Sequence, residues 1–119
     1  MTSESSTTTS TTTPPTTTTQ LPAPQNLTVV SDLVKNKKRT VELEWSSPSS
    51  PPYGIDHYDI YRDTLPIGSV TSSSSTINYT DSNFEKEDYS AHTYYVTVTY
   101  SNGVESGPSN EVTTTPTNL

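Results

Sequence analysis

Alternation of apolar and polar residues is the feature that most narrows the choice of fold for this chain. The segment VELEW at 41–45 alternates without a break, and YYVTVTY at 94–100 places tyrosine or valine at every second position. Successive side chains of a β-strand point to opposite faces, so a period of two predicts strands with one buried face. No segment shows the period of an amphipathic helix. The sequence therefore predicts an all-β protein.

Turn-forming residues divide the chain into seven such segments, and seven short strands predict an antiparallel sandwich. The candidate strands contain residues 27–29, 41–45, 58–61, 67–70, 76–80, 94–100 and 111–115. We expect the core to be built around Trp45, with Tyr58, Ile60, Val96 and Val98 packed against it.

The segments that flank the strands are of another kind. Residues 7–19 read TTTSTTTPPTTTT, with no charge and no apolar residue other than proline. Such a segment buries too little surface to offset the entropy of ordering it. We therefore expect a disordered Thr/Ser/Pro-rich linker at 1–21, a folded module at 22–116 and the start of a second linker at 117–119. A module between two tethers is typical of a longer, extracellular protein.

The composition excludes several kinds of partner. The formal net charge of -7 disfavours nucleic acid, because phosphate contacts need a basic face. The absence of cysteine excludes a disulfide framework, and no apolar run is long enough to insert into a membrane. The segment KNKKR at 35–39 holds four of the six basic residues. We interpret it as a solvated loop, with an anionic contact patch as the alternative.

Several segments, in their order along the chain, resemble the strands of a fibronectin type III domain. They are NLTV at 26–29, VELEWSSP at 41–48, HYDIYR at 57–62, YYVTVTY at 94–100 and GVESGPSNEV at 103–112. In addition, YRDTLPIGSV at 61–70 and TINYTDSNF at 76–84 are similar to modules of secreted prokaryotic glycoside hydrolases and surface proteins. The segment 84–94 lacks the family's usual Leu-x-Pro-Gly, which leaves the course of this loop open.

The resemblance implies a seven-stranded antiparallel immunoglobulin-like sandwich. It places Tyr94 at the family's corner tyrosine, a core residue whose hydroxyl would bond a nearby backbone group. It also implies a non-catalytic module that spaces and orients neighbouring domains, or contacts a partner, in a secreted or surface-anchored protein such as a polysaccharide-degrading enzyme. We expect a monomer without catalytic residues, cofactor or metal.

A second hypothesis is a binding module for carbohydrate or for a cell-surface protein. Alternation puts Tyr61 and Tyr95 on the outer face of the sandwich, and the resemblance puts their strands side by side. Two exposed rings could stack on a sugar. Equally, a cross-strand aromatic pair stabilises a sheet by about 0.2–1 kcal/mol without any ligand.

Signs of catalytic chemistry are weak. Glu42 and Glu44 lie two apart on a strand, so their carboxylates share a face at about 7 Å, near the separation in inverting glycosidases, but no cleft is implied. His57 and Asp59 are not accompanied by a nucleophile elbow such as G-x-S-x-G. The sequence therefore does not favour an enzyme.

Two kinds of surface site stay open. A weak calcium site would use the carboxylates of Asp81, Glu85, Glu87 and Asp88, although a lysine replaces the turn glycine of a calcium loop. His57 and His92 are weaker candidates for metal ligands. Asn26 and Asn78 begin Asn-x-Thr sequons, so they are candidates for N-glycosylation in a host that modifies asparagine.

Overall fold

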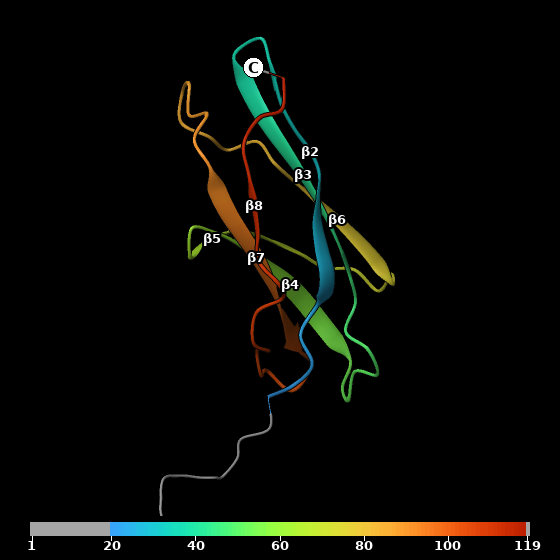
Figure 1. Ribbon diagram of the computed structural model, residues 1–119. Coiled ribbons are helices and arrows are strands. Elements are labelled where there is room, and N and C mark those ends of the chain that lie inside the picture. Colours follow the sequence, from blue (N-terminus) through green and yellow to red (C-terminus); the bar gives the residue numbers. More distant parts are fainter. Residues whose placement is uncertain (1–19, 119) are drawn as a thin grey trace, which may run out of the picture.

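Two antiparallel sheets face each other in the computed structural model, which describes residues 20–118 (Figure 1). One sheet has the order β2-β3-β6, with β2 at Gln25–Lys35, β3 at Lys38–Ser46 and β6 at Thr76–Asp81. The other has the order β5-β4-β7-β8, with β4 at Ile55–Arg62, β5 at Leu65–Val70, β7 at His92–Tyr100 and β8 at Val112–Thr114. The predicted all-β sandwich of seven antiparallel strands is confirmed.

The described residues begin shortly before the first strand of the sandwich. The expected disorder of residues 1–21 falls outside them, apart from Gln20 and Leu21. No helix that could cross a membrane occurs within 20–118.

The core lies between the sheets, where alternation brings apolar side chains together from both layers. On β3 the buried residues Val41, Leu43 and Trp45 alternate with half-buried residues. Trp45 meets Tyr58 of the opposite sheet edge to face, with ring centroids 5.6 Å apart and planes inclined by 65°. The side chains that sequence analysis assigned to the core are at most 1 % exposed: Trp45, Tyr58, Ile60, Tyr94, Val96 and Val98.

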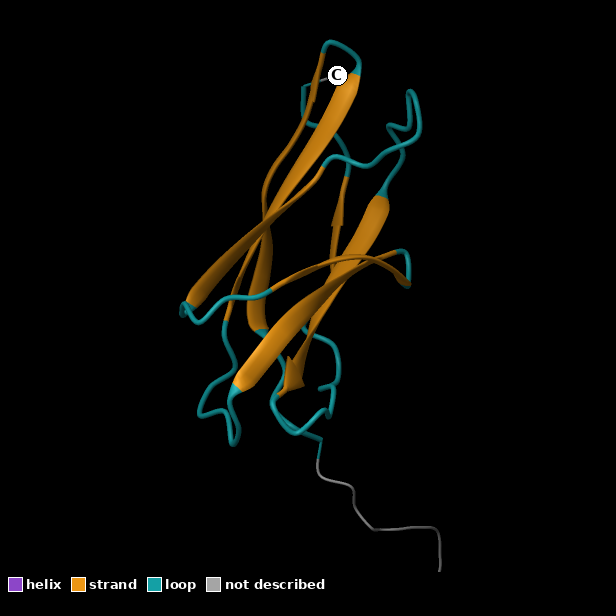
Figure 2. Ribbon diagram, turned by 180° about the vertical axis from the view of Figure 1, so that it is seen from behind, coloured by secondary structure: helices purple, strands orange, loops and turns teal. Residues whose placement is uncertain are grey.

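Two-residue turns close the β2–β3 and β4–β5 hairpins. The backbone φ is positive at both residues of each turn, with 54° and 64° at Asn36 and Lys37 and 52° and 71° at Asp63 and Thr64. This is the pattern of type I′ turns, whose twist matches that of the flanking strands. Loops gather at the two ends of the strands (Figure 2).

The basic segment 35–39 is part of the first hairpin and not a loop. β2 continues to Lys35, beyond the predicted strand at 27–29, and β3 begins at Lys38. The predicted solvated loop is wrong for Arg39, which is only 3 % exposed. Its guanidinium turns inward because the carboxylate of Asp32 on β2 is buried beside it.

Two asparagines hold the C-terminal segment against the edge of β2. The side chain of Asn110, before β8, accepts a hydrogen bond from the N–H of Leu27 at 2.9 Å and donates one to its carbonyl at 3.0 Å. Asn118, after β8, makes the same pair of bonds to Val34 at 2.9 and 2.8 Å. An amide side chain offers one donor and one acceptor, as a peptide group does, so each asparagine takes the place of a neighbouring strand.

The described chain enters the sandwich at one end and leaves at the other, beside the β2–β3 hairpin (Figure 1). Near the entry, Leu21 packs against the core and the hydroxyl of Tyr100 donates to the carbonyl of Pro22. Near the exit, the N–H of Thr117 donates to the carbonyl of Asp32 at 3.0 Å. Contacts with the sandwich therefore extend past both of the linker boundaries expected from the sequence.

Candidate functional site

Tyr61 and Tyr95 form a stacked pair on the outer face of the four-stranded sheet. They are direct partners in the register between β4 and β7, and their rings lie 4.7 Å apart with planes inclined by 10°. The sequence predicted both side chains to be exposed. Each is instead half-buried, because each ring covers a face of the other. One face of each ring is therefore closed to a sugar by the other ring.

A carboxylate holds the Tyr61 side of this pair. Glu105 Oε2 accepts hydrogen bonds from the hydroxyls of Tyr61 at 2.9 Å and Thr97 at 2.6 Å. Burial, together with the hydrogen bond to Glu105, raises the pKa of the Tyr61 phenol. The polar edge of Tyr61 is thus already engaged within the protein.

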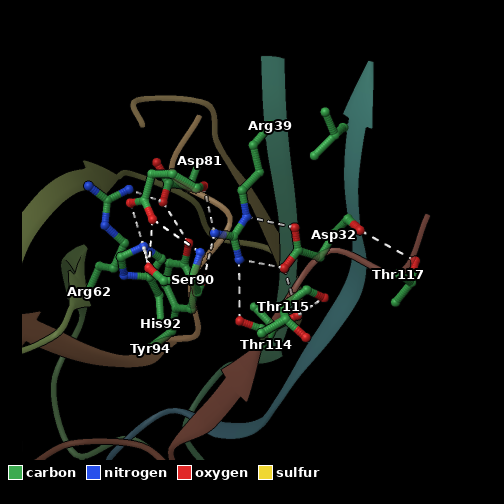
Figure 3. A network of polar contacts seen from close by, with 12 residues as sticks. Asp32, Arg39, Arg62, Asp81, Ser90, His92, Tyr94, Thr114, Thr115 and Thr117 are labelled. Atoms are coloured by element: carbon green, nitrogen blue, oxygen red, sulfur yellow. Dashed lines mark hydrogen bonds and ion pairs between the residues drawn. The ribbon is translucent and has the colours of Figure 1, made fainter. Parts of the chain in front are cut away.

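A buried ion pair lies between two neighbouring strands of the three-stranded sheet, at the end of the sandwich where the chain leaves (Figure 3). Arg39 donates to both oxygens of Asp32, at 2.9 and 2.7 Å, and the two side chains are 1 % and 0 % exposed. Its remaining N–H groups donate to the carbonyls of Asp88, Ser90 and Thr114, at 3.1, 2.8 and 3.3 Å. One guanidinium therefore links β2, β3, the loop before β7 and β8.

A second ion pair lies beside the first. Asp81 accepts hydrogen bonds from Arg62 and from the hydroxyl of Tyr94, both at 2.7 Å. The expected bond from the corner tyrosine to a backbone group is therefore wrong, because a buried carboxylate takes that place. Burial and this carboxylate raise the pKa of Tyr94 far above its ordinary value. The ring of Phe84 lies between the two guanidiniums, 4.7 Å from Arg39 and 4.6 Å from Arg62.

These contacts withdraw Asp81 from the calcium site that the sequence left open. Asp81 is 1 % exposed and its carboxylate is committed to Arg62 and Tyr94. Within residues 20–118 no three His, Asp or Glu side chains converge on a point that could hold a metal ion.

His92 is held between two carboxylates. Its Nδ1 lies 2.5 Å from Asp63 and its Nε2 lies 2.7 Å from Asp88, on opposite edges of the ring. A hydrogen bond from Ser90, assisted by His92, lowers the pKa of Asp88 to about 2. Burial acts to raise the pKa of Asp63, but the backbone N–H of Thr93 and the imidazole of His92 outweigh it and lower this pKa.

The other candidate residues stand apart from this network. His57 contacts Asp56 at 2.7 Å and Asp59 at 3.2 Å on the surface, and the hydrogen bond to Asp56 raises the His57 pKa. Glu44 accepts a bond from Asn78 at 3.4 Å, and Glu42 lies beside it on the half-buried face of β3. The sequon asparagines Asn26 and Asn78 are both exposed.

A cleft of about 500 Å³ opens at the end of the sandwich where the chain leaves. The β2–β3 hairpin lines one side with residues 36–40, and the loop before β7 lines the other with Ser82 and residues 84–89. Sequence analysis missed this cleft, because its walls are more than 40 residues apart in the chain. The only sequence signal was the basic segment 35–39.

Comparison with solved structures places the fold. An Fn3-like protein from Clostridium thermocellum is 23 % identical, with a TM-score of 0.57, and the match covers 85 % of this chain and 98 % of that one. The chain has a fibronectin type III fold. The same fold occurs in the fibronectin(III)-like modules of Clostridium thermocellum CbhA, which are 16 % identical with a TM-score of 0.51, covering 76 % of this chain and 96 % of that one.

The fold also occurs inside a larger enzyme. In the family 28 exopolygalacturonase of Yersinia enterocolitica the matching region is 17 % identical with a TM-score of 0.58. The match covers 79 % of this chain but only 20 % of the exopolygalacturonase. No family model and no curated protein sequence matches this chain.

Proposed function

We propose that this chain is a non-catalytic fibronectin type III module that spaces and orients neighbouring domains in an extracellular protein acting on polysaccharide. The observation that carries this proposal is the fixed course of the C-terminal segment. Asn118 and Thr117 bond to β2 at the end opposite to the chain's entry, so the module sets both the distance and the direction between the segments on either side of it.

The pairing of charged side chains inside the protein supports a structural role. The most conspicuous charged groups form two ion pairs within the protein. Asp32–Arg39 lies inside the three-stranded sheet, and Arg62–Asp81 joins the two sheets. Fusion of this fold to the exopolygalacturonase, and its occurrence in CbhA, supports a setting in carbohydrate-degrading proteins. An extracellular location belongs to the same proposal.

The spacing role can be tested by measuring the distance distribution across the module. In the whole chain a donor fluorophore is attached at the exposed Gln25, near the entry, and an acceptor at position 119, and single-molecule energy transfer is recorded. We expect a narrow distribution, broadened by Asn118→Ala, because the exit segment loses both bonds to Val34. Asn102→Ala, at an exposed turn, serves as the matched control. A distribution as broad as that of a flexible linker would refute the spacing role.

Binding of carbohydrate or of a cell-surface protein through Tyr61 and Tyr95 stays a prediction, and the stacking of the two rings argues against a flat sugar platform. Titration with soluble cello- and chito-oligosaccharides, followed by amide chemical shifts, tests it. A saturable shift around these two residues would favour the binding hypothesis over spacing alone.

A further inference from the structure

We propose that the cleft between the β2–β3 hairpin and the loop before β7 binds an acidic polysaccharide of the polyuronate class. This site is distinct from the spacing role, and either can fail without the other. The β2–β3 hairpin lines this cleft of about 500 Å³. The chain leaves the sandwich beside the same hairpin (Figure 1). Its floor is rigid, because Arg39 is buried there and stacks on Phe84.

All four lysines of this acidic chain lie at this end. Lys37, Lys38 and Lys86 line the cleft, and Lys35 is next to it on β2. The four side chains are exposed, and none has an ion-pair partner within the described part of the chain, residues 20–118. The two arginines, by contrast, are neutralised internally by aspartates. The free positive charge of the module is thus gathered around one cavity.

Each wall of the cleft carries a charged residue at a backbone position that favours glycine. Lys37 in the hairpin has φ 64°, and Glu87 in the opposite loop has φ 59°. A residue with a Cβ atom is disfavoured in this left-handed region, where glycine has no such penalty. The chain thus presents an ammonium group and a carboxylate across the cleft at a cost in backbone energy.

The mixture of charges indicates the chemistry of the ligand. Lysine ammonium groups pair with carboxylates, whereas the exposed carboxylates of Glu85 and Glu87 accept hydrogen bonds from hydroxyls. A uronic acid unit carries both a carboxylate and several hydroxyls, so it satisfies both walls at once. A polyphosphate or an acidic peptide offers chiefly acceptors, and the two glutamates would repel it. The carboxylate of Asp88 is already engaged within the protein by Ser90 and His92.

Titration of the whole chain with size-defined oligogalacturonates, read by amide chemical shifts, tests the proposal. We expect saturable shifts at residues 36–40 and 82–89, and none at Tyr61 and Tyr95. The methyl-esterified oligomer, which keeps the hydroxyls but loses the charge, should bind more weakly. Polyphosphate and polyglutamate of matched charge distinguish a specific site from general attraction to anions. Equal shifts with these polymers, or no saturable shift with oligogalacturonate, would overturn the proposal.

Two variants separate a built site from surface charge. Lys37→Gly should weaken oligogalacturonate binding about fivefold, the worth of one exposed ion pair, without lowering the denaturation midpoint, because glycine suits the turn. Lys35→Gln removes the same charge outside the cleft lining and should leave affinity nearly unchanged. If Lys35→Gln weakened binding as much as Lys37→Gly did, the site would be no more than a diffuse positive field.

For Glu85→Gln, charge attraction and hydrogen bonding to hydroxyls predict opposite changes in affinity. If charge attraction alone held the ligand, removal of this negative charge would tighten binding. If Glu85 accepts hydroxyl hydrogen bonds, as proposed, the weaker acceptor should loosen binding of oligogalacturonate. Tighter binding by Glu85→Gln would therefore overturn the assignment of a hydroxylated ligand.

Discussion

Replacement of Asp32 by asparagine should destabilise the module more than most surface changes would. The two side chains of the Asp32–Arg39 pair are 0 % and 1 % exposed, and the carboxylate accepts two of the guanidinium's five N–H donors. In Asp32→Asn the shape is kept, but the Arg39 charge is left buried without its counter-charge. Breaking a buried pair in this way costs about 3–5 kcal/mol, a large share of a typical 5–15 kcal/mol stability.

Urea unfolding followed by the fluorescence of Trp45, the single tryptophan, measures the change. Asp59→Asn is the matched control, because its partner His57 is at the surface and exposed pairs contribute about 0–1 kcal/mol. The double variant Asp32→Leu with Arg39→Met should be less destabilised than the sum of the single changes, since neither charge is then stranded. A loss below about 1 kcal/mol for Asp32→Asn, or strict additivity in this cycle, would show that the buried pair contributes little to the stability of the module.

Three further outcomes are expected. Trp45→Ala should lower the free energy of unfolding by about 3–5 kcal/mol, because it empties the middle of the core. A loss under about 1 kcal/mol in urea unfolding would mean that Trp45 is not central to the core. Tyr58→Phe should stabilise the module by about 1 kcal/mol, since the buried Tyr58 hydroxyl has no hydrogen-bond partner among residues 20–118; a clear loss of stability would mean that the hydroxyl is satisfied. Folding lowers the pKa of Asp88 from 3.8 to about 2, so its contribution is present above the unfolded value and is lost as the pH falls through about 2. Between pH 3.8 and about 2, the free energy of unfolding should fall less for Asp88→Asn than for the natural chain. Glu111→Gln, at an exposed position, is the control. An equal fall in Asp88→Asn and the natural chain would show that Asp88 does not couple stability to pH.

Local pattern predicted the central strands, because burial on one face of a strand imposes a period of two that neighbouring residues alone reveal. For this reason β7 was predicted nearly to its observed bounds, and the alternating part of β3 was predicted at 41–45, although the strand itself begins at Lys38. The end of β2 was missed, because its inward position is occupied by Asp32, which sequence reasoning assigns to solvent. The burial of Asp32 is favourable only because Arg39 pairs with it. From the sequence alone, each of the two charged residues is assigned to the surface.

Contacts between distant segments account for the rest of what was missed. Arg62 and Asp81 come from β4 and β6 of opposite sheets, so no local pattern joins them to Tyr94. The outward direction of Tyr61 and Tyr95 follows from alternation, but their mutual cover depends on the register between β4 and β7. The cleft depends on the course of residues 82–91, the stretch for which the family resemblance offered no guide.

The asparagine bonds along β2 determine how the module responds to tension. A pull on the two ends draws β2 toward the entry and the segment 110–118 toward the exit, so the two slide past each other. The bonds at Leu27, Asp32 and Val34 lie across this sliding direction and are loaded together. Hydrogen bonds loaded in parallel must break as a group, whereas bonds at a peeling edge break one at a time. A chain fixed to a surface at one end and to an insoluble polymer at the other would therefore keep its length under load until the whole row gave way.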